Sequence, residues 1–336
     1  DILSVVTFND RAEVIIPATL VRDKPALKAR ISMFSASGGT EIYQGLAAGV
    51  DQNRKFLGPK LVNHVVMITD GQTFGDQDQC LELAKQATKL GIGMSAMGLG
   101  SEWNDTFLDK LVSITGGTSE YINTAGAVVR FLNDHVRGLS NAFAERLKFS
   151  VAPDPDVALE LAFRLSPSPQ QLDHTSGEIP LGNLQYERPT SLLLQCQLPA
   201  EMELGYRSIA RLAVTGDVLQ NKNQRGFAMT DLSFEVTSEP EPEEPPAILL
   251  DALSKLTLYR LQERAQEALL NGDVVEATRR LENLATRLLA MGQGELATQA
   301  LAEARRVAHT SGVSDRGRMT IKYQTRHLLL NSGDEG

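Results

Sequence analysis

The sequence predicts an α/β doubly wound, Rossmann-like domain with a mostly parallel sheet, followed by an antiparallel β-sandwich and a C-terminal α-helical region. Apolar runs of strand length alternate with amphipathic helices up to about residue 145. Apolar and polar residues then alternate with period two, and helical spacing follows an acidic, proline-rich stretch. We therefore expect a first domain over 1–145, a sandwich over 146–238, a linker over 239–246 and a helical domain over 247–330.

The first region opens with two strands, Leu3–Phe8 and Val14–Pro17, joined by the turn signal Asn9-Asp10-Arg11. The nearly continuous apolar run Val62–Ile68 predicts a strand that is buried on both faces of its sheet. The other expected elements are helices over 24–34, 40–53, 76–90, 105–114 and 125–137, and strands over 92–99 and 120–122.

Period-two alternation is clearest in Val157–Leu165 and Leu192–Leu198, which is typical of strands in a sandwich. The four prolines of Glu239–Pro246 predict a stiff, exposed linker. Beyond it, segments beginning at Gly272 and Gly294 resemble each other at a 22-residue offset, which favours stacked helical hairpins. The pattern weakens after residue 309, and we expect only a helical turn over 321–330.

Composition excludes several classes of function. The net charge of -9 argues against a nucleic-acid partner, because phosphate binding needs clustered Lys and Arg. No apolar run approaches the roughly 18 residues of a membrane span. Cys80 and Cys196 are expected to be buried free thiols of a reducing compartment, so we expect a cytoplasmic protein. The chain begins in mid-strand at Asp1, so we expect a fragment, and a signal peptide on the native N-terminus would not be visible.

A candidate site lies where the strand over 62–68 ends. Asp70 follows this strand, and ligands of open α/β sheets bind at the carboxyl ends of strands. Thr40 lies in the glycine-rich segment Ser35–Tyr43, which opens a helix. A threonine hydroxyl and a carboxylate are donors that suit a hard cation. The structural alternative is an aspartate that only caps the segment that follows it.

Other candidates favour structural roles. Asp76 and Asp78 form either a calcium cluster or, as we expect, the negative charges that a helix N-terminus attracts. Trp103 either borders the binding face or packs against the following helix, and we expect packing. We find no zinc-ligand spacing, no nucleophile elbow, no phosphate-binding loop and no distinct acid–base pair, so we expect no enzyme.

Residues 1–145 resemble a von Willebrand factor A domain. The resemblance is carried by five stretches: Asp1–Asp10, Ala36–Tyr43, Val65–Asp76, Gly91–Asn104 and Gly116–Ile122. More narrowly, the chain resembles bacterial A-domain proteins of the calcium-activated chloride channel-like type, and this likeness extends through the sandwich and weakens in the helical tail.

The resemblance implies a metal-ion-dependent adhesion site (MIDAS), to which Thr40 and Asp70 would contribute. The family's Asp-x-Ser-x-Ser motif is absent from the 336 residues. The implied function is a non-enzymatic, metal-dependent module that captures an acidic residue of another protein. We expect Mg²⁺, or Mn²⁺ or Ca²⁺, in the complete protein and weak or absent metal binding by this chain. The alternatives are an adaptor or subunit of an AAA+ ATPase (MoxR-like) assembly, and a scaffold with a vestigial metal site.

The resemblance also implies that a first strand, which carries the absent motif, lies between Leu3–Phe8 and Val62–Ile68. We therefore expect a native chain with an additional N-terminal segment. Within these residues, we expect the two strands not to pair with each other.

Overall fold

The structure of the chain is a computed structural model that describes residues 1–33, 38–58, 61–73, 75–219, 224–239 and 244–330. The chain folds into two units. The first comprises residues 1–152, 173–188 and 210–232, and the second comprises 153–172, 189–209 and the chain from 233 onwards. Each unit contains some of the antiparallel strands. The domain boundaries predicted at 145 and 238 stay predictions.

The parallel sheet of the first unit has the order β3 (Asn63–Thr69), β4 (Ile92–Leu99) and β5 (Ser119–Ile122). The central strand β4 is almost entirely buried, as its run of apolar and small residues predicts. The prediction of a strand buried on both faces is wrong for β3, whose Ile68 is 39% exposed. The reason is its position, because β3 is an edge strand of this sheet.

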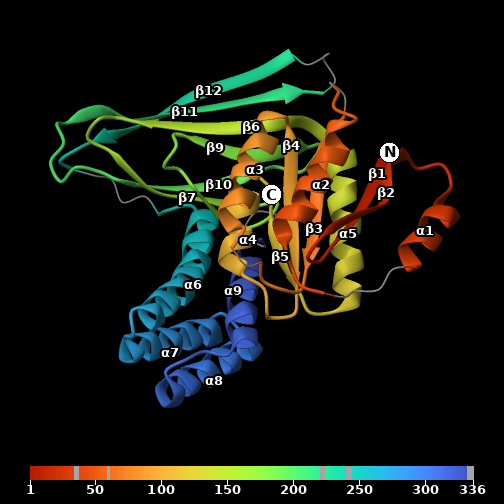
Figure 1. Ribbon diagram of the computed structural model, residues 1–336. Coiled ribbons are helices and arrows are strands. Elements are labelled where there is room, and N and C mark those ends of the chain that lie inside the picture. Colours follow the sequence, from red (N-terminus) through yellow and green to blue (C-terminus); the bar gives the residue numbers. More distant parts are fainter. Residues whose placement is uncertain (34–37, 59–60, 74, 220–223, 240–243, 331–336) are drawn as a thin grey trace. The chain divides into compact units, whose positions relative to one another are not determined.

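The strands β1 (Ile2–Phe8) and β2 (Ala12–Leu20) form a separate antiparallel sheet. The expectation that β1 and β3 do not pair is confirmed, because the two strands belong to different sheets (Figure 1).

Helix α2 (Ile42–Arg54) packs against β1, β2 and β3 and so links the two sheets. It approaches them through two glycines one turn apart. A Cβ atom placed on Gly45 would lie 2.5 Å from the ring of Phe8 in β1, so the ring occupies the space that a side chain would need. At Gly49 the added atom would lie 3.5 Å from Cγ1 of Val65 in β3, which is ordinary contact. The closest approach of α2 to a sheet therefore depends on Gly45.

The remaining helices of the first unit are α1 (Lys24–Ser32), α3 (Gln77–Lys89), α4 (Asp105–Ser113) and α5 (Ala125–Ser140). Helices α3 and α4 pack on β4, and α5 contacts β5 and β9. Side chains of a strand alternate between its faces, so Val65 faces α2 and the neighbouring His64 faces the opposite side. There His64 meets His135 of α5, with ring centroids 4.5 Å apart.

The histidine pair is held in an uncharged environment. His64 Nε2 is hydrogen-bonded to Ser95 Oγ at 3.0 Å, and the ring of His135 stacks on Phe131 with centroids 5.5 Å apart. Burial, with a smaller contribution from His135, lowers the pKa of His64 well below its ordinary value of 6.5. Burial alone lowers the pKa of His135 to about 4. Both rings are therefore neutral at pH 7, and protonating either one opposes the packing of α5 on β3.

In the described part of the chain, seven strands follow α5 and form two sheets with the orders β12-β11-β6-β9 and β10-β7-β8. Within them β6 pairs with β9, and β7 pairs with both β8 and β10. These pairs are antiparallel, as predicted. Their bounds are β6 Ala142–Pro153, β7 Ala158–Ser166, β8 Gln170–Leu172, β9 Glu178–Gln185, β10 Ser191–Gln197, β11 Gly205–Val218 and β12 Gln224–Val236.

The helical domain consists of α6 (Ala247–Leu270), α7 (Val274–Ala290), α8 (Gly294–Thr310) and α9 (Asp315–Leu330), with α7 packed between α6 and α8 (Figure 1). Gly272 and Gly292 end α6 and α7 at φ 78° and 74°, a left-handed conformation that glycine adopts without strain. These equivalent positions lie 20 residues apart, so the hairpins repeat at a shorter offset than predicted. The predicted linker lies partly outside the described residues, which exclude 240–243.

Helix α9 was predicted only as a turn over 321–330. Two of its buried residues, Lys322 and Arg326, are charged, which hides the apolar stripe on which a sequence-based prediction depends. The guanidinium of Arg326 lies over the rings of Tyr323 and Tyr259, 5.0 and 5.7 Å from their centroids. Lys322 also lies over the ring of Tyr323, at 5.9 Å. Cation–π contacts with these rings therefore stabilise the two buried cations.

We expect Gly45→Ala to destabilise the protein by about 1–3 kcal/mol, because its Cβ overlaps the ring of Phe8 in a packed interior. Gly49→Ala is the matched control in the same helix. There the added methyl group fits, so we expect a gain of up to about 1 kcal/mol from helix propensity. Urea denaturation followed by circular dichroism measures both. Equal stability of the Gly45→Ala variant and the parent would show that α2 does not need this close approach.

The histidine pair predicts acid sensitivity. The unfolded chain takes up protons on these histidines below pH 6.5, whereas folded His135 does not until about pH 4. Stability is therefore fully present above pH 6.5 and is lost as the pH falls through that interval, by about 3 kcal/mol for His135. We expect His135→Gln to flatten the dependence of the unfolding free energy on pH between 6.5 and 4. The exposed His309 provides the control His309→Gln, which should keep the parental slope. A parental slope in His135→Gln would refute this account.

Candidate functional site

The two predicted site residues lie on segments that meet at the carboxyl edge of the parallel sheet. Asp70 directly follows β3 and is exposed, and Thr40 directly precedes Glu41, the N-cap of α2. The Thr40 hydroxyl lies against Gly71, where an added Cβ atom would be only 2.7 Å from Thr40 Oγ1. The structure therefore brings Thr40 next to the loop that carries Asp70. The part of the predicted loop over 35–37 lies outside the described residues.

The loop after β3 is fastened to the start of α2. Thr73 Oγ1 accepts a hydrogen bond from the backbone N–H of Ile42 at 3.1 Å and donates one to Asp76. The other carboxylate oxygen of Asp76 accepts from the N–H of Tyr43 at 2.8 Å. These side chains supply the cap that Glu41 does not provide, and they fix the position of Thr40 relative to Asp70.

This geometry decides between the two interpretations of Asp76. Both of its carboxylate oxygens are engaged by Thr73 and α2, as expected for a charge at a helix N-terminus. The detail differs from the prediction, because Asp76 is the N-cap residue of α3 yet its side chain caps α2. Asp78 lies in the first turn of α3 and is exposed.

Asp10 is a neighbouring carboxylate that was not predicted as a site residue. Its Oδ1 atom lies against Gly39, the residue before Thr40, so a Cβ atom at Gly39 would collide with it. The backbone holds this approach in place, because the N–H of Glu41 donates to the carbonyl oxygen of Asn9 at 2.8 Å. No local sequence pattern identifies this contact, because Asp10 and Gly39 lie far apart in the sequence.

Trp103 and the two cysteines do not join the site. Trp103 is 1% exposed, packs over Gly98 and donates its indole N–H to the carbonyl oxygen of Gly100 at 2.9 Å. It is therefore a packing residue, and the neighbour that it packs over is Gly98 of β4. The expected packing against the following helix stays a prediction. Cys80 and Cys196 are both free thiols, and only Cys80 is fully buried. Burial, followed by the charge of Asp76, raises the pKa of Cys80 to about 12, so it stays protonated and is a poor metal ligand.

The donor types suit a hard divalent cation, but the donors are few. A hydroxyl and carboxylates are the oxygen ligands that Mg²⁺ and Ca²⁺ prefer, and Mg²⁺ takes about six of them. In the described part of the chain, no three His, Cys, Asp or Glu side chains come together in a metal-binding group. Thr40 and Asp70 therefore fit such an ion by chemistry and leave most of its coordination shell to water or other ligands.

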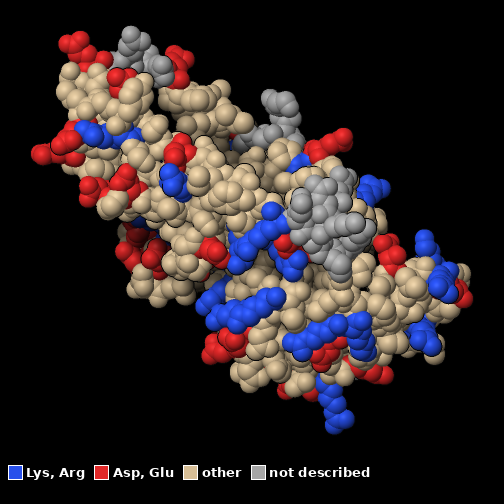
Figure 2. Space-filling model, turned by 90° about the horizontal axis from the view of Figure 1, so that it is seen from above, with Lys and Arg blue, Asp and Glu red and all other residues tan. Residues whose placement is uncertain are grey.

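Charge at the surface is mixed. On the face seen in Figure 2, lysine and arginine side chains lie among aspartates and glutamates. The whole chain has a net charge of -9, so an anionic ligand needs a local source of positive charge. None of the helices in the described ranges has the length and apolar character of a membrane span.

Comparison with known proteins agrees with this architecture. Residues 1–133 match the model of the von Willebrand factor type A domain, and residues 247–331 match that of the Sll0103-like, C-terminal alpha-helical domain. The chain is 27% identical over 298 residues to the uncharacterized protein sll0103 of Synechocystis sp., covering 85% of this chain and 69% of the relative. It is 23% identical over 159 residues to the uncharacterized protein YfbK of Escherichia coli, covering 46% of this chain and 28% of YfbK.

A solved structure supports the fold of the whole chain. The von Willebrand factor type A protein from Catenulispora acidiphila superposes with a TM-score of 0.74 at 15% identity, covering 97% of this chain and 80% of that one. An α/β domain at the start, antiparallel strands and a helical end are therefore the architecture of both. The chain therefore contains a von Willebrand factor type A (VWA) domain over residues 1–133 and an Sll0103-like α-helical domain over residues 247–331.

Proposed function

We propose that this protein is a non-enzymatic module that captures an acidic residue of a partner protein through a divalent cation at the carboxyl edge of its VWA sheet. VWA domains are generally non-catalytic and interact with proteins. The observation that carries the proposal is the contact of Thr40 with Gly71, which sets a hydroxyl beside the exposed Asp70. The narrower likeness to the calcium-activated chloride channel-like type stays part of this proposal.

Thr40 and Asp70 would hold the ion, which is Mg²⁺ or Mn²⁺ in this proposal, with Ca²⁺ as the further candidate. When bound, the ion supplies the positive charge that attracts a carboxylate. The chain's own residues position the donors. Thr73 and Asp76 hold the loop to α2, and Gly71 leaves room for the Thr40 hydroxyl. Because this chain contributes few donors, we expect it to bind the metal more weakly than the micromolar range.

The exposure of Asp70 favours a binding role for this residue over a structural one. Asp76 is tied into α2 by two hydrogen bonds, whereas Asp70 is exposed at the end of its strand. Removing a bonded, half-buried carboxylate destabilises a fold, and removing an exposed one changes stability little. A loss of metal binding without a loss of stability is therefore the expected result at Asp70.

We expect Asp70→Ala and Thr40→Val to lose Mn²⁺ binding while their melting temperatures stay within a few degrees of the parent. Water proton relaxation measures the bound Mn²⁺, and thermal denaturation measures stability. Asp78→Asn is the matched control, an exposed aspartate nearby in sequence that should bind Mn²⁺ like the parent.

Capture of partners by the immobilised chain in Mg²⁺ should then be abolished by EDTA and by Asp70→Ala alike. A lower melting temperature in Asp70→Ala with Mn²⁺ binding unchanged would assign this residue a loop-holding role. Capture that persists in EDTA would favour a scaffold in which the metal site has no function.

A further inference from the structure

We propose that strand β12 is the surface through which two copies of this chain associate, by antiparallel pairing of residues 225–231 with the same residues of the second copy. Strand β12 is an edge of the four-stranded sheet β12-β11-β6-β9 (Figure 1). Residues 225–231 and the part of β11 beside them belong to the first unit. An edge strand presents a row of backbone N–H and C=O groups to which another strand can bind.

One face of β12 carries two apolar side chains between two charged ones. Arg225, Phe227, Met229 and Asp231 follow each other at every second position, so they share a face of the strand. Phe227 is 66% exposed and Met229 is 53% exposed. Folding of a single chain therefore leaves both large apolar side chains in contact with water, and a strand added beside β12 would cover part of them.

Contacts with β11 hold β12 in position. Arg211 donates two hydrogen bonds to the carboxylate of Asp231, at 2.7 and 3.1 Å. A Cβ atom at Gly226 would lie 3.6 Å from the carbonyl oxygen of Gly216. These two contacts show that β12 runs antiparallel to β11 and that its inner edge is occupied. In the described part of the chain, no other strand pairs with β12, so its outer edge stays open to a strand from another molecule.

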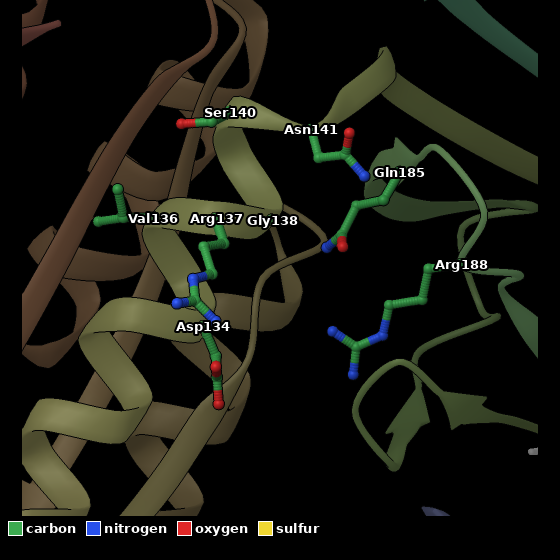
Figure 3. Close-up of a pocket in the computed structure, with 8 residues that line it drawn as sticks. All are labelled: Asp134, Val136, Arg137, Gly138, Ser140, Asn141, Gln185 and Arg188. Carbon is green, nitrogen blue, oxygen red and sulfur yellow. The ribbon is translucent and has the colours of Figure 1, made fainter.

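The opposite edge of the same sheet is protected in two ways. Strand β9 contains Pro180, which removes one backbone donor. The end of β9 also packs on α5, where a Cβ atom at Gly138 would lie only 2.6 Å from Gln185 Nε2 (Figure 3). Strand β12 contains neither proline nor lysine, the residues that commonly prevent the pairing of edge strands. It is therefore the unprotected edge of this sheet.

The side chains of residues 225–231 complement their own copies in one register. A two-fold axis at Ala228 sets Arg225 opposite Asp231 of the second copy, and Phe227 opposite Met229 of the second copy. Opposite charges stabilise such cross-strand pairs, and so does a sulfur atom beside an aromatic ring. Symmetry makes each pair occur twice. An axis at the residue before or after Ala228 sets Arg225 opposite an uncharged residue and so loses the charge pair.

The competing explanation for Asp231 is its ion pair with Arg211 in the same chain. A carboxylate has about four sites that accept hydrogen bonds, and the side chain of Asp231 is 54% exposed beside Arg211. It can therefore accept from Arg225 of a second copy as well. The ion pair within the chain also leaves the exposure of Phe227 and Met229 unexplained.

Sedimentation velocity of the full chain over a range of concentrations tests the association. We expect an equilibrium between monomer and dimer. Met229→Lys should weaken the dimer at least tenfold, because it sets a charge opposite the ring of Phe227. Since Met229 is exposed, we expect this variant to keep its melting temperature. Leu270→Lys is the control, which replaces an 89% exposed leucine at the end of α6 and should associate like the parent.

Cysteine substitution tests the register. Ala228→Cys places two thiols opposite each other across the axis, so mild oxidation should give a disulfide-linked dimer. Thr230→Cys is the matched control on the same face, because its two thiols would lie about 14 Å apart, four residues along the strand. Both substitutions are made together with Cys196→Ser, since Cys196 is a free thiol that is only partly buried.

Three results would overturn the proposal. The first is a parent chain that sediments as a monomer at every concentration, which would leave this edge to a strand of a different protein. The second is a Met229→Lys variant that associates like the parent, which would place the interface elsewhere. The third is an Ala228→Cys variant that forms no more cross-linked dimer than Thr230→Cys.

Discussion

The close packing of α2 onto two separate sheets is the constraint on which the VWA half depends. Because Gly45 has no side chain, the ring of Phe8 reaches the helix backbone, and Val65 of the other sheet packs beside Gly49. The same helix receives its N-terminal cap from Thr73 and Asp76, which follow β3. One helix thus sets the spacing of the sheets and the position of Thr40. A substitution that alters the packing of α2 therefore changes the candidate metal site, even when it replaces no candidate ligand.

Much of this arrangement was predictable from the sequence, because local pattern and tertiary structure agree there. Strand β4 lies at the centre of its sheet, so its apolar run has the expected bounds of Ile92–Leu99. Strand β3 has a similar run but is an edge strand, and a run of apolar residues does not reveal an edge position. Helix α9 was missed for the opposite reason. Its Lys322 and Arg326 are buried against aromatic rings, and a pattern-based prediction assigns such charges to the surface.

The candidate site likewise has residues that were predictable from the sequence and contacts that were not. Thr40 and Asp70 were predicted because each stands at a junction of a loop with a regular element, where sequence pattern is informative. The contact of Asp10 with Gly39 and the capping of α2 by Asp76 join residues about 30 positions apart, and no local pattern encodes them. The packing of Gln185 against α5 lies further beyond prediction. It joins residues more than 40 positions apart, and its only local signal is Gly138, a glycine inside a helix.

Helix ends explain why charge gathers at both edges of the parallel sheet. The N-terminus of α2 attracts negative charge, and Asp76 satisfies it, so the nearby Asp70 remains exposed for another cation. The C-terminus of α5 attracts positive charge, and Arg137 lies in its last turn. In a chain with a net charge of -9, an anion meets attraction only where positive charge is concentrated. A bound metal would provide that concentration at the carboxyl edge of the sheet.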